Sequence, residues 1–501
     1  MADEQNTSVV VEDEEQTTIN QSYMNRLFCS TKERITFVLL NCVSGMRLGD
    51  YELGSDIFLY KIFGITSPTR YAKASLWLKT YDILNDPLTA VIVDNMRTRW
   101  GKFKPFQYLS FLPGFLVGFI NCILPMLSLA FGWQDTQRIY AMIALNFCSE
   151  TIAALIGSGG GYLGTVFTPN PDERTSLVLA AQFVDDLISK LPQQIMQVCM
   201  DFVFKNEYTA RVVKFYVIFR TTIYFIMQIP GIAWVFVSKE RVPQSEKLPT
   251  PLHSLKAVFT NKPLLIYTFS GLVDGIDIGT NQSLYYTDVV KFNLMKTIGG
   301  IPGAPISYAS YPIATKFRKK FSTKALWLMC RGSVFISEGF FFLMGMIGGR
   351  KNGLYKKKIP MTIVFALGNC FEMVFFASRK LVGQEISFEV LDYCEWKNGY
   401  RVEATITLVQ GYFEKIKSAL LSLVNAWLLE KWAGFEGGLG KIQNDETKWK
   451  MFLTAFGPHL IFDALSMVPM FFYNIDKKTR DKMYLELEIA RSQRSNIEDN
   501  S

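Results

Sequence analysis

The chain has 501 residues, of which 49% are hydrophobic, 14% aromatic and 20% charged, and its formal net charge is +8. This excess of apolar residues, with apolar stretches long enough to cross a bilayer, is typical of a polytopic membrane protein and argues against an ordinary soluble domain. Lysine and arginine gather between the apolar stretches, which favours basic loops at lipid headgroups over nucleic-acid binding. The 8 cysteines have no CxxC spacing, so neither a zinc ribbon nor a disulfide framework is predicted.

The N-terminal residues 1–35 are polar and acidic, without the basic start and apolar core of a signal peptide. We expect them to form a disordered cytoplasmic tail. After this tail the sequence predicts twelve membrane-spanning helices, several of them interrupted by charged residues. They lie near 36–64, 71–95, 105–131, 137–167, 175–204, 212–238, 263–288, 297–316, 324–347, 360–378, 402–433 and 449–473.

A polar stretch with several prolines, residues 239–262, separates two halves of six helices, 36–238 and 263–473. We expect this stretch to be a cytoplasmic linker and the substrate cavity to lie between the halves. Residues 474–501 mix basic with apolar residues. They are expected to form a cytoplasmic tail, either as an amphipathic helix on the inner leaflet or as a solvated helix.

Two basic loops occupy equivalent places in the two halves. Arg97–Lys104 follows the second span, and Lys316–Lys320 follows the eighth. The positive-inside rule places both loops, and with them both termini of the chain, in the cytoplasm of a cell-membrane protein. The basic loop Arg350–Lys358 then lies outside, against the same rule.

The acids of the second span are the strongest functional signal. Asp82 and Asp86 are four residues apart, so a helix projects both carboxylates from one face, and Lys79 shares that face. Charges in a membrane helix are costly unless they face protein or water, which favours a binding site. Two carboxylates and the Asn85 amide supply the oxygen ligands that hard cations prefer. The pattern predicts a cation site; the other interpretation is that Lys79 neutralises one acid and the pair braces the helix.

The same region resembles a known family. The stretch Thr80–Pro105, TYDILNDPLTAVIVDNMRTRWGKFKP, resembles helix II and the following loop of the glycoside–pentoside–hexuronide:cation symporters, the melibiose-permease branch of the major facilitator superfamily. A second stretch, Asp392–Glu403 (DYCEWKNGYRVE), resembles the loop before helix XI of that family. The resemblance implies an all-α membrane protein with the twelve-helix major facilitator fold. It also implies symport of a sugar or glycoside-like solute with Na⁺ or H⁺, by alternating access.

Several site roles follow from the resemblance. Asp82 and Asp86 match the coupling-cation acids of the family, and Lys415 matches the helix XI lysine that lies near them. Lys415 and Lys79 are therefore predicted to be coupling counter-charges; the alternative for Lys415 is that its ammonium group snorkels to the headgroups. The loop after helix II is predicted either to latch a gate or only to fix the topology. Its charged residues are Asp94, Arg97, Arg99 and Lys102.

The chain departs from the family at the sugar-binding positions. Gly157, Gly161 and Gln182 stand where melibiose-type members carry an aspartate, a tryptophan and an arginine. Small residues allow close helix packing, and the loss of hydroxyl-binding groups leaves open a larger or less polar cargo such as a lysolipid. Other polar residues of the spans are predicted to line the substrate cavity. They are Tyr81, Glu150, Gln182, Asp185, Gln410 and Tyr412.

Further ionisable residues lie within the spans. Asp274 and Glu372 are alternative polar ligands for a solute, and His459 with Asp463, four residues apart, suits either a proton relay or a simple hydrogen-bonded pair. The sequence has no nucleophile elbow, P-loop or HExxH motif, so we expect neither an enzyme nor a cofactor beyond the coupling ion. The expected partners are a small solute and the lipid bilayer, with a monomeric chain. A solute sensor without transport is the alternative from another class.

Overall fold

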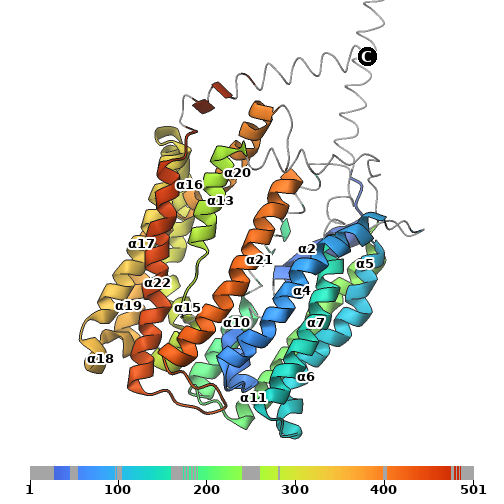
Figure 1. The fold of residues 1–501 in the computed structure, drawn as a ribbon, viewed down its shortest axis with the longest axis vertical. Coiled ribbons are helices and arrows are strands. Elements are labelled where there is room, and N and C mark those ends of the chain that lie inside the picture. The colour runs from blue at the N-terminus through green and yellow to red at the C-terminus, as the bar shows by residue number, and fades with distance from the viewer. Residues whose placement is uncertain are drawn as a thin grey trace, which may run out of the picture. The chain divides into compact units, whose positions relative to one another are not determined.

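The computed structural model describes residues 27–45, 55–95, 104–159, 190–239, 260–279, 282–398 and 403–475, together with Thr98 and single residues within 173–188 and 479–486. Helices and the turns between them make up this part of the chain, as Figure 1 shows. The α-helices are α2 (Thr31–Gly45), α3 (Ser55–Ile57), α4 (Pro68–Asn95), α5 (Lys104–Leu109), α6 (Phe115–Ala130), α7 (Asp135–Gly159), α10 (Leu191–Val198), α11 (Ala210–Val237), α13 (Lys262–Asp274), α14 (Gln282–Leu284), α15 (Met295–Gly300), α16 (Gly303–Lys320), α17 (Thr323–Met346), α18 (Gly349–Asn352), α19 (Lys358–Met373), α20 (Phe376–Asn398), α21 (Glu403–Trp427) and α22 (Asp445–Phe471). The π-helical turns are η1 (Phe58–Ile62), η2 (Ser110–Gly114), η4 (Cys199–Val203), η5 (Tyr285–Val290) and η7 (Leu428–Trp432), and η6 (Leu354–Lys356) is a 3₁₀ turn.

Four helical segments in this described part are long and apolar enough to cross a membrane. They are Lys104–Ala130, Ala210–Val237, Thr323–Met346 and Asp445–Phe471. A fifth is added if Lys358–Met373 and Phe376–Gly383, which meet at an angle of 53°, form one bent span. The protein is therefore a multi-pass membrane protein. The helices α4 and α21 fall outside this set because charged side chains lower their hydropathy, and the number of twelve spans stays a prediction.

The contacts of the chain divide it into two compact units. Unit 1 consists of Met1–Gly64, Thr80–Met196 and Tyr208–Glu246, and unit 2 consists of Ile65–Lys79, Gln197–Glu207 and Lys247–Ser501. The long C-terminal part of unit 2 begins after Glu246, within the polar stretch 239–262. Two short segments from the first half of the sequence thus belong to unit 2.

The core of unit 1 forms around α11, which packs against α2 and α6. Trp234 on α11 is buried, and its ring lies 5.5 Å from that of Phe37 on α2. The buried guanidinium of Arg220 donates hydrogen bonds to both the side-chain and the main-chain oxygen of Asn121 on α6. It also lies 4.3 Å from the ring of Phe58. These partners allow a charged group to remain inside an apolar core.

The core of unit 2 forms around α17 and α22, which pack against each other. The helix α13 packs on α22, while α19 and α20 pack on α17 (Figure 1). The rings of Tyr285, Phe341 and Phe456 meet in this core with centroids 4.8 to 6.3 Å apart. The hydroxyl of Tyr285 donates to the main-chain oxygen of Tyr355 at 2.8 Å. This cluster fixes the two helices that carry the charged residues described next.

Candidate functional site

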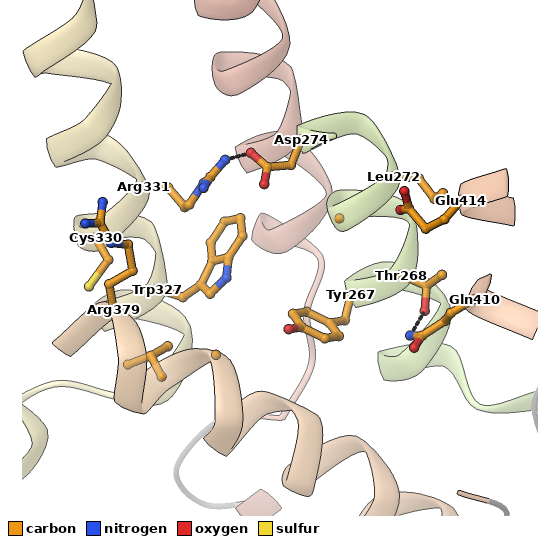
Figure 2. A pocket seen from close by; sticks show the side chains of 13 residues that line it. Tyr267, Thr268, Leu272, Asp274, Trp327, Cys330, Arg331, Arg379, Gln410 and Glu414 are labelled. Carbon is orange, nitrogen blue, oxygen red and sulfur yellow. Dashed lines mark hydrogen bonds and ion pairs between the residues drawn. The ribbon is translucent and has the colours of Figure 1, made fainter. Parts of the chain in front are cut away.

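A cavity of about 340 Å³ lies in unit 2, with walls formed by α13, α17, α20 and α21 (Figure 2). Each helix contributes residues one or two turns apart, because positions i, i+3, i+4 and i+7 share a helix face. Gly271 on α13 and Gly383 on α20 belong to the wall, and a Cβ atom at either position would meet no atom within 4 Å. The two glycines therefore keep part of the volume open. Its size falls within the usual range for small-molecule sites, about 300–1,000 Å³.

Aromatic and uncharged polar side chains line one part of this cavity. Tyr267 of α13 and Trp327 of α17 lie between these helices in Figure 2. The amide of Gln410 on α21 donates a hydrogen bond to the hydroxyl of Thr268 at 2.8 Å. Flat aromatic faces combined with a few hydrogen-bonding groups are the usual lining of sites for small solutes.

Charged residues line the rest of the cavity, and they occur largely as neutral pairs. Arg331 of α17 forms an ion pair with Asp274 of α13, as Figure 2 shows. Arg379 of α20 pairs with Glu372 of α19, with 2.5 Å between nitrogen and oxygen. Such pairs compensate much of the cost of charge inside a membrane protein. The cavity can therefore offer both hydrogen-bond donors and acceptors to a solute.

A second group of charges lies behind Arg331. The guanidinium reaches the carboxylate of Asp463 on α22 at 3.3 Å, and Asp463 is 2% exposed. The ring nitrogen Nδ1 of His459 lies 2.7 Å from a carboxylate oxygen of Glu338 and 3.4 Å from one of Asp463. Because one nitrogen faces two carboxylates, it must carry a hydrogen to be held there. The three possible ligand atoms lie within 4.8 Å of one another, so a proton can be shared among them.

Helical spacing explains how the sequence builds this network. Arg331 and Glu338 are two turns apart on one face of α17, and His459 and Asp463 are one turn apart on α22. The sequence predicted the His459–Asp463 pair but neither Arg331 nor Glu338. The available signal was two charged residues, seven positions apart, in an otherwise apolar helix.

The predicted cation-binding acids lie on α4. Asp82 is half-buried and Asp86 follows one turn later, although the side chain of Asp86 lies outside the described residues. Asn85 is 6% exposed, and within the described part of the chain its amide nitrogen has no hydrogen-bond partner. The ammonium group of Lys79 donates to the main-chain and side-chain oxygens of Ser418 on α21, at 2.8 and 3.1 Å. The roles of all four α4 residues stay predictions.

Gln410, one of the predicted substrate residues, lines the described cavity, and so does Asp274, which was predicted as an alternative ligand for a solute. Tyr81 lies on α4, with its hydroxyl 2.9 Å from that of Thr151 and its ring 4.3 Å from that of Phe147, both on α7. Tyr412 is half-buried on α21, like Lys415 one turn further along.

The remaining predicted residues are not brought to this cavity. Glu150 and Asp185 are half-buried in unit 1, and one carboxylate oxygen of Asp185 is buried without a hydrogen-bond partner among the described residues. The other candidates lie outside the described residues. These are Gln182, Arg97, Arg99, Lys102 and the side chain of Asp94.

Comparison with known proteins gives consistent matches. A family described as "MFS/sugar transport protein" matches residues 51–477. The chain is similar to an isoprimeverose transporter of Lactiplantibacillus pentosus, with 23% identity over 487 residues that cover 93% of each protein. It is also similar to a lactose permease of Leuconostoc lactis, with 24% identity over 431 residues that span 82% of this chain and 63% of the permease, under two thirds of its length. A glucuronide carrier protein homolog of Escherichia coli is 21% identical over 482 residues, covering 89% of this chain and 95% of the carrier.

Proposed function

This chain belongs to the MFS/sugar transport protein family, and from that premise we propose that it carries a sugar or glycoside-like solute across a membrane together with a cation. It is a transporter and not an enzyme. The proposed mechanism is alternating access, in which the solute site opens to one side of the membrane at a time.

The observation that carries the proposal is the lining of the cavity in unit 2. Trp327 and Tyr267 offer apolar faces to a sugar ring, while Gln410 and Thr268 offer hydrogen bonds to its hydroxyl groups. The paired charges of the wall add further donors and acceptors. Isoprimeverose, lactose and a glucuronide, which are named for the relatives, are the first solutes to test.

The coupling cation, Na⁺ or H⁺, binds at Asp82 and Asp86 of α4 in this proposal, with Asn85 as an uncharged ligand. Burial of Asn85 and half-burial of Asp82 support this role, because hard cations bind oxygen atoms that are held inside the protein. Lys415 is the proposed counter-charge. Cation-driven accumulation of the solute follows if the carrier reorients only when both sites are filled or both are empty.

Counterflow in proteoliposomes tests the proposal. Purified protein is reconstituted, the vesicles are loaded with unlabelled isoprimeverose, lactose or a glucuronide, and entry of the labelled compound is followed with and without Na⁺ and at several pH values. We expect labelled sugar to enter transiently above its equilibrium level, and faster with the coupling cation.

Two results would contradict this function. Saturable binding of a sugar without exchange would indicate a solute sensor. Exchange of a labelled lysolipid, run as a parallel arm, with no exchange of any sugar would mean that the cargo is an amphiphile.

A further inference from the structure

A hollow of about 460 Å³ lies where several helices of unit 2 begin or end, and lysines from separate segments line it. They follow η4 and η5, lie in η6, and stand in the first turns of α19 and α22. These lysines are Lys205, Lys291, Lys356, Lys358 and Lys448. Like charges repel, so ammonium groups gathered around one space favour a compensating anion.

The backbone beneath this lysine hollow is strained. Lys205, Asn206 and Lys291 have φ angles of 49°, 59° and 56°. Within the described residues, they are the only ones other than glycine with a positive φ. Such conformations are unfavourable for residues other than glycine and persist where their surroundings hold them, commonly at binding sites. All of this strain is gathered at one place in unit 2.

Asp201 holds the strained turns together. Its carboxylate accepts hydrogen bonds from the main-chain nitrogens of Asn293 and Leu294, at 3.0 and 2.9 Å. It also accepts from the side-chain amides of Asn206 and Asn293, at 3.0 and 2.9 Å. Asn206 donates in addition to the main-chain oxygen of Lys291 at 3.1 Å. Asp201 is thus occupied in shaping the hollow and does not form an ion pair with a lysine in the described part of the chain.

The positive charge of the hollow exceeds the acids around it. Lys356 and Lys448 share the carboxylate of Asp445, at 3.1 and 3.7 Å. The other three lysines are exposed, and no carboxylate in the described part of the chain pairs with them. Counting Asp201, five ammonium groups face two carboxylates, so three positive charges are left over.

We propose that the lysine hollow is a binding site for an anionic group: a phosphate, a sulfonate or a carboxylate. Lysine binds such groups as a point charge, and a pre-shaped backbone lowers the cost of ordering the site. A free anionic solute and the headgroup of an anionic lipid offer the same chemistry. The site also gives a role to the basic loop Arg350–Lys358, whose predicted position outside the membrane goes against the positive-inside rule.

The test compares a double variant with a matched control. Lys205→Gln/Lys291→Gln removes two charges from the hollow. Lys351→Gln/Lys357→Gln removes two exposed charges from the neighbouring loop without touching its lining. In one arm, protein in neutral detergent is titrated calorimetrically with inorganic phosphate and with glucuronate. In the other arm, protein in nanodiscs of phosphatidylcholine and phosphatidylglycerol is assayed by native mass spectrometry for retained phosphatidylglycerol.

We expect the hollow variant to lose about tenfold or more in affinity in at least one arm, and the control to stay within about twofold. A loss in the detergent arm identifies a soluble anion, and a loss in the nanodisc arm identifies a lipid headgroup. Unchanged binding in both arms, or an equal loss in the control, overturns the proposal. Lys358→Gln, which lies in a regular helix, repeats the test without altering a strained residue, and the melting temperature of each variant checks its folding.

Discussion

Arg331 contacts two acids at once, and this links the cavity to a buried histidine. One acid, Asp274, lines the cavity, and the other, Asp463, is shared with His459. When His459 gains a proton, it competes more strongly with Arg331 for Asp463. The charge at the cavity wall is therefore connected to proton binding about two turns away on α17, where Glu338 holds the other side of the ring. This link depends on the packing of α13, α17 and α22, because each of these helices supplies at least one of the charged side chains.

The histidine prediction uses the fact that the chain has 2 histidines, His253 and His459. His459→Gln keeps a hydrogen-bonding side chain but cannot be protonated, while Glu338, Asp463 and Arg331 remain around it. We expect the pH dependence of counterflow to flatten, because glutamine cannot take up the proton that the imidazole ring holds between Glu338 and Asp463. His253→Gln is the control and should keep the wild-type profile. An unchanged profile in His459→Gln would remove this residue from the transport cycle.

The cation site gives a second prediction at this scale. Asp86→Cys removes one of two carboxylates that lie one turn apart on α4. We expect cation-driven uptake to be lost while solute counterflow driven by exchange alone persists, because a hard cation then lacks a charged oxygen ligand. Uptake is measured with an imposed Na⁺ gradient and with an imposed pH gradient. Full gradient-driven accumulation by the variant would show that Asp86 is not a ligand.

At the scale of elements, glycines decide how much room the helices leave. Gly271 and Gly383 each face open space in the cavity wall. Gly299 on α15, by contrast, lies against Phe365, and an added Cβ would collide with that ring. One residue type thus opens a cavity in one helix and permits close packing in another.

Enlarging a cavity glycine should reduce solute binding without unfolding the protein. Gly271→Leu places a side chain in open space and replaces glycine with a better helix former. We expect the apparent affinity for isoprimeverose or lactose in counterflow to fall by about tenfold or more, as the side chain takes volume from the solute. Gly411→Leu is the control: this α21 glycine also faces open space, but it does not line the cavity. Equal effects of the two substitutions would mean that the cavity is not the solute site.

The sequence predicted the family and some polar residues of the cavity, but it did not predict the aromatic residues of the cavity or the partners of the ion pairs. The α4 motif led to the family, and two of the predicted polar residues, Gln410 on α21 and Asp274 on α13, line the cavity. Trp327 and Tyr267 were missed because aromatic residues are common in every span, so their spacing carries no signal. Arg331 and Glu338 were visible as charges, but their partners depend on how α13, α17 and α22 pack, and the spacing within one helix does not encode that packing.

At the scale of the whole molecule, the family match extends over residues 51–477, and within the described part hydropathy alone identifies four spans, or five with the bent pair. Hydropathy identifies fewer spans than the twelve that were predicted, and this has a physical cause. Charged side chains lower the hydropathy of α4 and α21, so hydropathy alone does not identify these helices as spans. The twelve-span prediction rests on the family motifs for these helices. The assignment of Ile65–Lys79 and Gln197–Glu207 to unit 2 depends on contacts far apart in the sequence, which no local pattern reveals.

One such long-range contact should be important for stability. Asp201→Asn places an amide where the carboxylate accepts hydrogen bonds from segments about 90 residues away. Each bond to a charged acceptor contributes about 1.5–3 kcal/mol, so we expect the variant to melt at a clearly lower temperature. Glu436→Gln, which removes an exposed ion pair with Lys441, should change the melting temperature little. Identical melting of the two variants would show that Asp201 does not stabilise unit 2.

The lysine hollow also has a consequence for the speed of the carrier. Asp201, Asn206 and Lys205 precede the polar stretch 239–262 in the chain, and their partners Asn293 and Lys291 follow it. An anion bound both by Lys205 and by lysines that follow this stretch would strengthen the contact between these two parts of the chain. If each turnover requires these segments of unit 2 to shift against each other, more anion in the medium slows turnover and leaves the concentration of sugar at half-maximal binding unchanged. Anions in the medium would then regulate the rate of the carrier from a hollow that is separate from the sugar cavity.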